Sequence, residues 1–421
     1  MTARNAERPM RILMLGPWVP SARYPVEAER LLRFARHLVN GHRLTLAFAT
    51  DVPDHSGTIL ALRAEFKDME FAVVPRRLRR LWSALRLFGK ASVDLTYFDS
   101  AALRTRLRDR QRTSPFDVVY AATAGMIRHA LDLERPGPLV IDFGDLDSEW
   151  WERRAAGSPR LKAELYRAEA SRVRELEQAA ARRATVSMVS SLQAAERIAS
   201  FAPGVPVVVV PNGVDPERYP AGPHRATEPV IAFTGSLEGA GGLDAATEFC
   251  RVVLPAVRAR VAGARVVIPG RYLTRSARRL ARLPGVEIVG NGGNLQALLR
   301  HAAVAVSPSG DSNGARQGAL EAMAAGVPLV ASRKSLNGLW AKFDREVYVK
   351  DDAGSLARRL VELLSSESMR AEVGSRGRAF VRAHHSWEAA AVHVAQVVER
   401  VLSITSRASR PGSALEAPAR P

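Results

Sequence analysis

The sequence predicts an α/β protein built of two Rossmann-like domains. Short apolar runs typical of buried strands alternate with segments of helical periodicity, and Arg11–Leu15 and Arg43–Thr50 flank one such segment. The stretch Val304–Ser332 has the order strand, small-residue loop, helix and second strand, which is a βαβ unit. The chain has 421 residues, which is enough for two domains of ordinary size.

Further elements follow along the chain. Pro211–Asp215 (PNGVD) places Pro and Asn-Gly where the chain has to turn, so a second domain is expected to begin after it. A long polar helix is expected at Arg160–Arg183. Buried-type strands are expected at Phe116–Tyr120, Leu139–Phe143, Pro229–Gly235, Arg265–Ile268, Val286–Val289, Ala302–Val306 and Leu329–Ala331.

Composition narrows the class of protein. With 47% apolar and 25% charged residues, the chain has the composition of a globular protein. The single cysteine, Cys250, excludes disulfides within the chain and a Cys-rich metal site, and core packing is its expected role. The apolar stretch Met10–Val19 is too short for a membrane span and is interrupted by Gly16 and Pro17. A cytoplasmic location is therefore expected.

The formal net charge is +18, which favours anionic partners, although the abundance of Arg over Lys also fits GC-rich coding. The clearest local cluster is Arg76–Lys90, where apolar residues at helical spacing accompany six cations and no acid. Two interpretations remain open. The segment is either a peripheral helix on the inner face of an anionic membrane or a helix packed on the N-terminal domain with a solvated basic face. Nucleic acid is not an expected partner.

The βαβ unit has the features of a phosphate site. The loop before its helix leaves backbone N–H groups unpaired at the positive end of the helix dipole. Glu321 follows Gly314 by seven residues, close to two helical turns, so both lie on one face. The carboxylate is thereby placed to accept hydrogen bonds from ribose hydroxyls while the loop holds a diphosphate. The alternative is that Glu321 is an exposed, solvated residue of the helix.

This segment resembles the C-terminal half of family 4 glycosyltransferases, which have the GT-B fold of two Rossmann-like domains facing across a cleft. Glu321 matches the second Glu of the family's E-x7-E motif, and Asn313 stands at the place of the first. A closer resemblance is to the sugar transferases associated with exosortase and PEP-CTERM exopolysaccharide systems. Of their Gly-x-Gln-Asn-Lys-x-x-Glu pattern, Gly314 and Glu321 are present, and Gly318 stands at the place of Lys.

The resemblance implies a UDP- or GDP-linked sugar donor in the C-terminal domain. Two places where the family has phosphate-binding cations hold Ser236 and Gly318, so Arg316 in the first helical turn is expected to replace them. Gly318→Lys is then expected to tighten donor binding and to remove a mid-helix glycine. The implied donor-binding residues are Gly235, Ser236, Arg271, Gly290, Asn291, Ser309, Asn313, Gly314, Ala315, Arg316 and Glu321.

On the acceptor side, Asp145 is the candidate base. It lies in GDLDSEWWERR, which is similar to an Asp-x-Asp-Ser-Glu-x-Trp run of the exosortase-associated enzymes, and it follows a strand end of the kind that holds ligands in α/β sheets. The Asp-x-Asp formed with Asp147 superficially matches the metal motif of GT-A enzymes. Capping of the next helix by Asp147 or Ser148 explains it adequately, and no metal site is expected.

Two further acceptor-side features come from the resemblance. Gly16 and Arg23 lie in the loop after the first strand, which borders the acceptor in GT-B enzymes, with a plain structural loop as the alternative. The place of the family's catalytic-region His holds Ala121–Thr123 instead. His129 is expected to be an exposed residue of the next helix.

The domain boundaries combine the turn at Pro211 with the resemblance. They are an N-terminal acceptor-side domain at 10–210, a linker at 211–228, a nucleotide-sugar-binding domain at 229–385, a C-terminal crossover helix at 386–402 and a disordered tail at 403–421.

The expected function is transfer of a sugar from a nucleotide-sugar donor to a glycan or lipid-linked acceptor, retaining and metal-independent, without a cofactor, in polysaccharide or glycoconjugate synthesis. One alternative is a catalytically weak or inactive GT-B protein that binds nucleotide or glycan and partners an active transferase. An NDP-sugar epimerase or hydrolase is a third possibility.

Overall fold

The computed structural model divides the chain into two compact units. Unit 1 comprises Met1–Pro211 with Ala390–Pro421, and unit 2 comprises Asn212–Ala389. Residues 9–20, 26–50, 56–73, 92, 98–134, 137–156, 158–219, 226–235, 237, 240–270, 275–290, 295–308, 313–336, 339 and 341–408 are described, without the side chains of 26, 124, 240, 241, 313–316 and 403–408.

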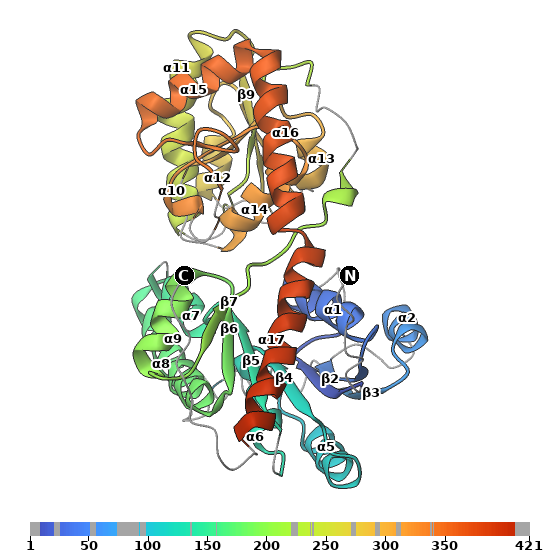
Figure 1. Cartoon of the computed structure of the whole chain (residues 1–421). Coiled ribbons are helices and arrows are strands. Elements are labelled where there is room, and N and C mark those ends of the chain that lie inside the picture. Colours follow the sequence, from blue (N-terminus) through green and yellow to red (C-terminus); the bar gives the residue numbers. More distant parts are fainter. Residues whose placement is uncertain are drawn as a thin grey trace, which may run out of the picture. The chain divides into compact units, whose positions relative to one another are not determined.

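Unit 1 is built on a seven-stranded parallel sheet of order β3-β2-β1-β4-β5-β6-β7 (Figure 1). Its strands are β1 (Arg11–Gly16), β2 (Arg43–Thr50), β3 (Met69–Val73), β4 (Val118–Ala122), β5 (Leu139–Gly144), β6 (Val186–Val189) and β7 (Val207–Val209). The inner strands are buried on both faces, which is why they are nearly continuous apolar runs.

Helices cover both faces of this sheet. Leu13, Leu15 and Ile141 belong to a core cluster with residues of the α5–α9 region, whereas the alternating residue Asp142 meets Arg30 of α1 on the other face. The helices are α1 (Val26–Leu38), α2 (Gly57–Glu65), α5 (Ala101–Thr113), α6 (Thr123–Leu131), α7 (Asp147–Ala156), α8 (Arg160–Arg183) and α9 (Leu192–Phe201).

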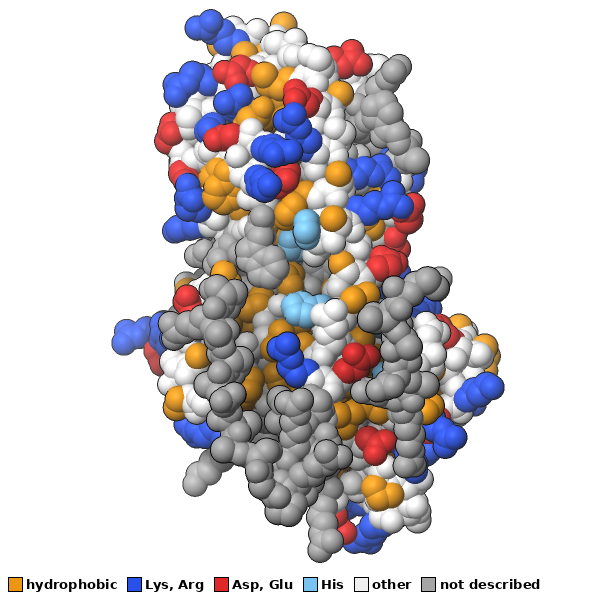
Figure 2. Space-filling model, in the orientation of Figure 1, with side chains coloured by type: hydrophobic (Ala, Val, Ile, Leu, Met, Phe, Trp, Pro, Cys, Tyr) orange, Lys and Arg blue, Asp and Glu red, His pale blue; other side chains and the backbone are white. Residues whose placement is uncertain are grey.

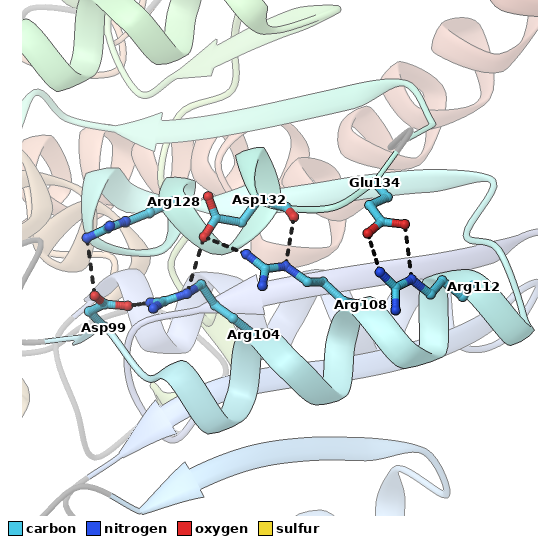
Figure 3. Close-up of polar contacts among 7 residues, drawn as sticks. All are labelled: Asp99, Arg104, Arg108, Arg112, Arg128, Asp132 and Glu134. Atoms are coloured by element: carbon cyan, nitrogen blue, oxygen red, sulfur yellow. Dashed lines mark hydrogen bonds and ion pairs between the residues drawn. The ribbon is translucent and has the colours of Figure 1, made fainter.

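The arginines of α5 are neutralised locally. Arg104, Arg108 and Arg112 recur every four residues and face Asp132 and Glu134 after α6 (Figure 3). The Arg104 and Arg108 guanidiniums lie 3.2 and 3.3 Å from Asp132 Oδ2. On the face that Figure 2 shows, Lys and Arg side chains are likewise spread out with acids among them. The basic sequence of α5 is therefore not a patch for an anionic macromolecule.

Unit 2 has a six-stranded parallel sheet of order β10-β9-β8-β11-β12-β13. Its strands are β8 (Val230–Phe233), β9 (Arg265–Pro269), β10 (Val286–Val289), β11 (Val304–Ser307), β12 (Leu329–Ala331) and β13 (Tyr348–Val349). Together the two sheets confirm the prediction of an α/β chain with two Rossmann-like domains.

Two cores lie on the opposite faces of this second sheet. One contains Phe233 and the buried free thiol Cys250, which confirms the packing role expected of the cysteine, and the other contains Ala232 and residues of α14. The helices are α10 (Ala240–Glu248), the π-helical turn η2 (Phe249–Val253), α11 (Leu254–Arg258), α12 (Arg275–Leu280), α13 (Leu295–Leu299), α14 (Asn313–Ala324), α15 (Ala353–Ser365) and α16 (Glu367–His384), with 3-10 turns η1 (Pro216–Arg218) and η3 (Lys334–Leu336).

The last helix, α17 (Trp387–Ala408), belongs to unit 1 from Ala390 onward and buries Val394 and Val398. In the structure α17 continues to Ala408, past the end at residue 402 that was expected for the crossover helix. Residues 409–421 and the basic segment Arg76–Lys90 lie outside the described residues.

Candidate functional site

Unit 2 has a topological switch point between β8 and β11. These strands pair with each other, and the chain then leads outward through β9 to β10 on one side and through β12 to β13 on the other. Beyond their carboxyl ends lie Thr234 and Gly235 after β8, and Pro308 after β11. Ligands of open α/β sheets bind at such a point. The helix α14 begins next, at Asn313, as the sequence predicts for a phosphate-binding helix.

Close backbone packing holds α14 against the end of β8. Thr234 donates its N–H to the carbonyl of Val306 at 3.0 Å, which fixes the residue after β8 beside β11. A Cβ atom at Gly318 would lie 2.5 Å from the Thr234 carbonyl oxygen and 2.9 Å from the Thr234 Cβ. Replacement of this mid-helix glycine is therefore not favourable for packing, because a side chain at position 318 would force α14 or β8 to shift. The expected effect of Gly318→Lys on donor binding stays a prediction.

Glu321 lies two turns into α14 and is partly buried. The hydroxyl of Tyr219 donates to its Oε2 at 3.4 Å. Burial first, and then the negative charge of Glu321, raise the pKa of Tyr219 far above its ordinary value, so the phenol remains a donor. Glu321 is thus oriented by a buried side chain that the sequence did not point to.

Two more polar groups at the switch point were missed from the sequence. Ser307 Oγ and Gln317 Oε1 are buried without a hydrogen-bond partner among the described residues. The amide of Gln317 also donates to the Gly213 carbonyl at 3.5 Å. An unsatisfied buried polar group is costly, so such atoms are suited to a polar ligand. The only sequence signal was a serine ending an otherwise apolar strand.

The structure describes only some of the predicted donor-binding residues. Gly235 is buried after β8, Gly290 forms the turn after β10, and Asn313–Arg316 form the first turn of α14, described by their backbone alone. The expected phosphate contact of Arg316 therefore stays a prediction. Ser236, Arg271, Asn291, Ser309 and the acceptor-side Arg23 lie outside the described residues.

In unit 1, the candidate base Asp145 lies just beyond the carboxyl end of β5. Gly144 has a left-handed φ of 59°, and the pairing of β5 with β6 is irregular between Asp142 and Gly144. The chain is turned there so that the Ser190 hydroxyl donates to Asp145 Oδ1 at 2.5 Å. Asp145 is partly exposed, whereas Asp142, three residues earlier, is buried. The sequence cluster of acids therefore separates into different environments.

Asp142 forms a buried ion pair with Arg30 of α1. Arg30 Nε donates to Asp142 Oδ2 at 2.7 Å, and its Nη1 donates to the Pro211 carbonyl at 3.3 Å. The Tyr120 hydroxyl also hydrogen-bonds to Asp142, and its pKa is raised well above the ordinary value, first by burial and then by the Asp142 charge. Asp142 is therefore a structural acid rather than a base available to a substrate.

Glu27, in the first turn of α1, is the titratable neighbour of Asp145. Burial raises the pKa of its carboxyl, a backbone hydrogen bond lowers it, and the charge of Asp145 raises it further. Gly16 lies before this turn, where a Cβ would come within 2.1 Å of Leu31 Cδ2. Close packing of β1 on α1 thus explains why a glycine occupies position 16. The predicted acceptor-side role of Gly16 stays a prediction.

The start of α7 is capped in an unexpected way. Ser148, expected as one possible cap, instead donates its N–H and its hydroxyl to the buried carboxylate of Glu177, 3.1 Å to Oε1 and 2.5 Å to Oε2. Burial raises the pKa of Glu177 to about 7 although these hydrogen bonds lower it. The helix that follows the Asp145 loop is therefore fixed by a carboxylate from α8.

His129 contradicts its prediction. It lies within α6 as expected, but it is fully buried, and neither ring nitrogen has a hydrogen-bond partner among the described residues. Burial first, and then the charge of Arg104, lower its pKa to about 4. The ring packs inside unit 1 as a neutral group. Its position in the last turn of α6 gave no sign of this.

The described residues contain no group of three or more His, Cys, Asp or Glu side chains arranged to hold a metal ion. None of their helices combines the length and hydropathy needed to cross a bilayer.

Comparison with known proteins agrees with this geometry. Residues 228–366, which span β8 to α15, match the family model described as glycosyl transferases group 1. No curated protein matches the sequence. The matched segment contains the switch point, α14 and Glu321.

The fold as a whole is that of GT-B glycosyltransferases. Sucrose-phosphate synthase from Thermosynechococcus elongatus is 16% identical with a TM-score of 0.60, over 94% of this chain and 100% of that one. Anabaena HepE, in complex with UDP and glucose, is 15% identical with a TM-score of 0.60, over 93% and 100%. S. aureus TarM is 11% identical with a TM-score of 0.64, over 95% and 100%. The family match over residues 228–366 supports a glycosyltransferase, and the similar structures show the fold.

Proposed function

We propose that the protein transfers a sugar from a nucleotide-sugar donor to a glycan or lipid-linked acceptor. The observation that carries the proposal is the position of Glu321. It lies on α14, which follows β11 at the switch point, inside the segment that matches the glycosyl transferase model. A carboxylate two turns from the helix start is placed to bind ribose hydroxyls while the first turn binds phosphate.

The donor is a UDP- or GDP-linked sugar in this proposal. The similar structure of Anabaena HepE was solved in complex with UDP and glucose, which supports a nucleotide-sugar donor in this proposal. The buried Ser307 hydroxyl at the end of β11 and the backbone N–H groups in the first turn of α14 are the polar groups proposed to contact it. Arg316 is proposed as the cation that compensates the diphosphate.

On the acceptor side, Asp145 is proposed as the base, with Ser190 holding its carboxylate and Glu27 as the second acid. We further propose a retaining, metal-independent reaction and membership of family 4, near the exosortase-associated transferases. Association with an anionic inner membrane surface through Arg76–Lys90, and a cytoplasmic location, complete the proposal.

A second candidate is a catalytically weak protein that binds nucleotide and partners an active transferase. The tight contact of Gly318 with Thr234 favours it, because a lysine cannot be accommodated there without moving α14. Ala121–Thr123 stands in place of the family's His, and Asn313 in place of the first Glu.

Calorimetric titration of UDP- and GDP-sugars, followed by assay of hydrolysis and transfer, tests these candidates. Glu321→Ala is expected to weaken nucleotide binding by about 1 to 3 kcal/mol through lost charge-assisted hydrogen bonds. Glu362→Gln on the exposed face of α15 is the matched control. Unchanged affinity in folded Glu321→Ala contradicts the donor site. Normal binding without any turnover leaves the second candidate in its place.

A further inference from the structure

Unit 1 has a topological switch point of its own, between β1 and β4. These strands pair with Leu15 opposite Ala121, and the chain leads outward through β2 to β3 on one side and through β5 to β7 on the other. The carboxyl ends of the parallel strands meet at one edge of the sheet, and ligands of open α/β sheets bind there. Trp18 follows β1 and Thr123 follows β4 at this edge.

Thr123 has a backbone conformation that its side chain does not favour. Its φ is 60°, and among the described residues it is the only β-branched residue in this left-handed region. A β-branched residue is strained at such a φ, and strained residues cluster at functional sites. Gly144, at the end of the neighbouring strand β5, has nearly the same φ of 59° without that strain. A glycine at position 123 would relieve the backbone, so folding does not explain the threonine.

The hydroxyl of Thr123 is accessible to a ligand. The side chain is partly exposed, and within the described part of the chain its Oγ1 forms no hydrogen bond. A threonine hydroxyl can both donate and accept a hydrogen bond. The strained backbone therefore presents a small polar group at the switch point of unit 1.

An aromatic ring lies at the same edge of the sheet. Trp18 packs on the core of unit 1, and its ring meets that of Phe98 edge to face at a centroid distance of 4.9 Å. Phe98 in turn packs on the first turn of α6, because a Cβ atom at Gly125 would lie only 2.5 Å from Phe98 Cδ2. Trp18 is thereby connected to the helix that Thr123 begins, and part of its side chain stays exposed.

An exposed aromatic surface and a hydroxyl suit a pyranose ring. The C–H groups of a sugar ring pack on an aromatic face, whereas its hydroxyls need hydrogen-bond partners. Asp145, the proposed base, follows β5, which pairs with β4. Trp18, Thr123 and Asp145 thus follow three adjacent strands, β1, β4 and β5, at one edge of the sheet.

We propose that Trp18 and Thr123 bind the sugar ring of the acceptor, with the Trp18 ring packed on its C–H groups and Thr123 Oγ1 bonded to one of its hydroxyls. The inference rests on the proposed function and narrows it, because the acceptor then presents a pyranose rather than a bare lipid phosphate. A phosphate would call for cations. The titratable side chains described nearest to Asp145 include the acid Glu27, and Arg30 is already paired with Asp142.

The first experiment is saturation-transfer NMR of the full chain with the methyl glycosides of glucose, galactose, mannose and N-acetylglucosamine, without nucleotide. Saturation of ring C–H protons is expected for at least one of these sugars. Trp18→Leu keeps an apolar side chain without the aromatic face, and it is expected to weaken binding of that sugar roughly tenfold. The matched control is Phe343→Leu, which replaces a 41% exposed aromatic side chain of unit 2 and is expected to bind as wild type does.

Thr123→Gly separates a binding role from a structural one. Because glycine relieves the backbone, the urea midpoint is expected to be at least as high as that of wild type. Affinity for the same sugar is expected to fall roughly threefold to tenfold through the lost hydrogen bond. Thr123→Ser keeps the hydroxyl and is expected to retain most of the affinity. The matched control is Asp344→Gly, at a φ of 57° in unit 2, which is expected to leave binding unchanged.

Calorimetric titration of UDP-glucose and GDP-mannose into the same variants distinguishes this site from the donor site. Donor affinity is expected to be unchanged in Trp18→Leu and Thr123→Gly, and circular dichroism confirms that both are folded. An equal loss of donor affinity overturns the acceptor assignment. Sugar binding that depends on Trp18 and Thr123 in a chain that binds neither nucleotide sugar supports the site and contradicts the proposed function.

Three further results overturn the proposal while the proposed function stands. One is a wild type that binds a nucleotide sugar but none of the four methyl glycosides. Another is wild-type sugar affinity in both Trp18→Leu and Thr123→Gly. The third is a Thr123→Gly variant that loses stability and sugar binding together, with the same losses in Thr123→Ser, which makes Thr123 a structural residue.

Discussion

The carboxylate of Glu177 on α8 accepts hydrogen bonds from both the backbone N–H and the hydroxyl of Ser148 at the start of α7. The sequence separates these residues by 29 positions, yet the contact fixes the helix that follows the Asp145 loop. A carboxylate that is 1% exposed also makes the anchor sensitive to pH. Burial raises its pKa from 4.5 to about 7.

Glu177→Gln is expected to flatten the pH dependence of stability. The pKa of Glu177 is higher in the folded than in the unfolded protein, so protonation of Glu177 favours the folded state. This contribution to the free energy of unfolding is fully present below pH 4.5 and is lost as the pH rises to about 7. The loss is on the order of 3 kcal/mol. Urea unfolding at a series of pH values measures it. The same slope in Glu177→Gln as in wild type would show that another group is responsible.

Gly318→Ala is expected to destabilise unit 2, although alanine is the better helix former by about 1 kcal/mol. The added Cβ would lie 2.5 Å from the Thr234 carbonyl oxygen, and overpacking of this kind typically costs about 1 to 3 kcal/mol. The matched control is Gly354→Ala near the start of α15, where a Cβ meets nothing closer than 3.4 Å. Thermal unfolding of Gly318→Ala and Gly354→Ala measures the two effects. A stabilised Gly318→Ala would mean that α14 can move away from β8.

Removing one partner of the Arg30–Asp142 pair is expected to cost about 3 to 5 kcal/mol, because the other charge is left buried. The two side chains are 4% and 2% exposed. Arg30→Met and Asp142→Asn should each lower the urea midpoint strongly, and the double variant should recover part of the loss. Arg112→Met is the exposed control, since Arg112 and Glu134 are 59% and 55% exposed, and its effect should be much smaller. Equal effects of the buried and exposed variants would contradict this account.

The fold was more predictable than the site. The inner strands of both sheets, such as β5 and β11, are continuous apolar runs because they are covered on both faces, and the sequence shows that directly. The edge strand β3 went unrecognised because it is half exposed, and β13 because it has only two residues. The βαβ unit was found because its loop, helix and following proline are local signals.

The contacts that define the candidate site are not local. From the sequence alone, Gly318 in α14 only lowers the helix propensity. The structure shows that it is there because Thr234 lies against it. His129 has the sequence surroundings of a surface residue, with Arg128 beside it, and only the packing of α6 shows that it is buried. The capping of α7 by Glu177 and the orientation of Glu321 by Tyr219 depend on side chains far away in the sequence.

Tyr219→Phe separates the two interpretations of Glu321. If Glu321 binds ribose, its ligand is the nucleotide, and the hydroxyl of Tyr219 at 3.4 Å from Oε2 only orients the carboxylate. Tyr219→Phe is then expected to weaken nucleotide binding by less than about 1 kcal/mol, the usual net value of one such hydrogen bond, whereas Glu321→Ala costs more. Calorimetry on both variants and the double variant gives their coupling energy. Because Tyr219 is 5% exposed, unfolding of Tyr219→Phe is measured in parallel. Should both single variants bind nucleotide as wild type does while losing equal stability, the pair is a structural contact that holds η1 on α14, and Glu321 is not a ribose ligand.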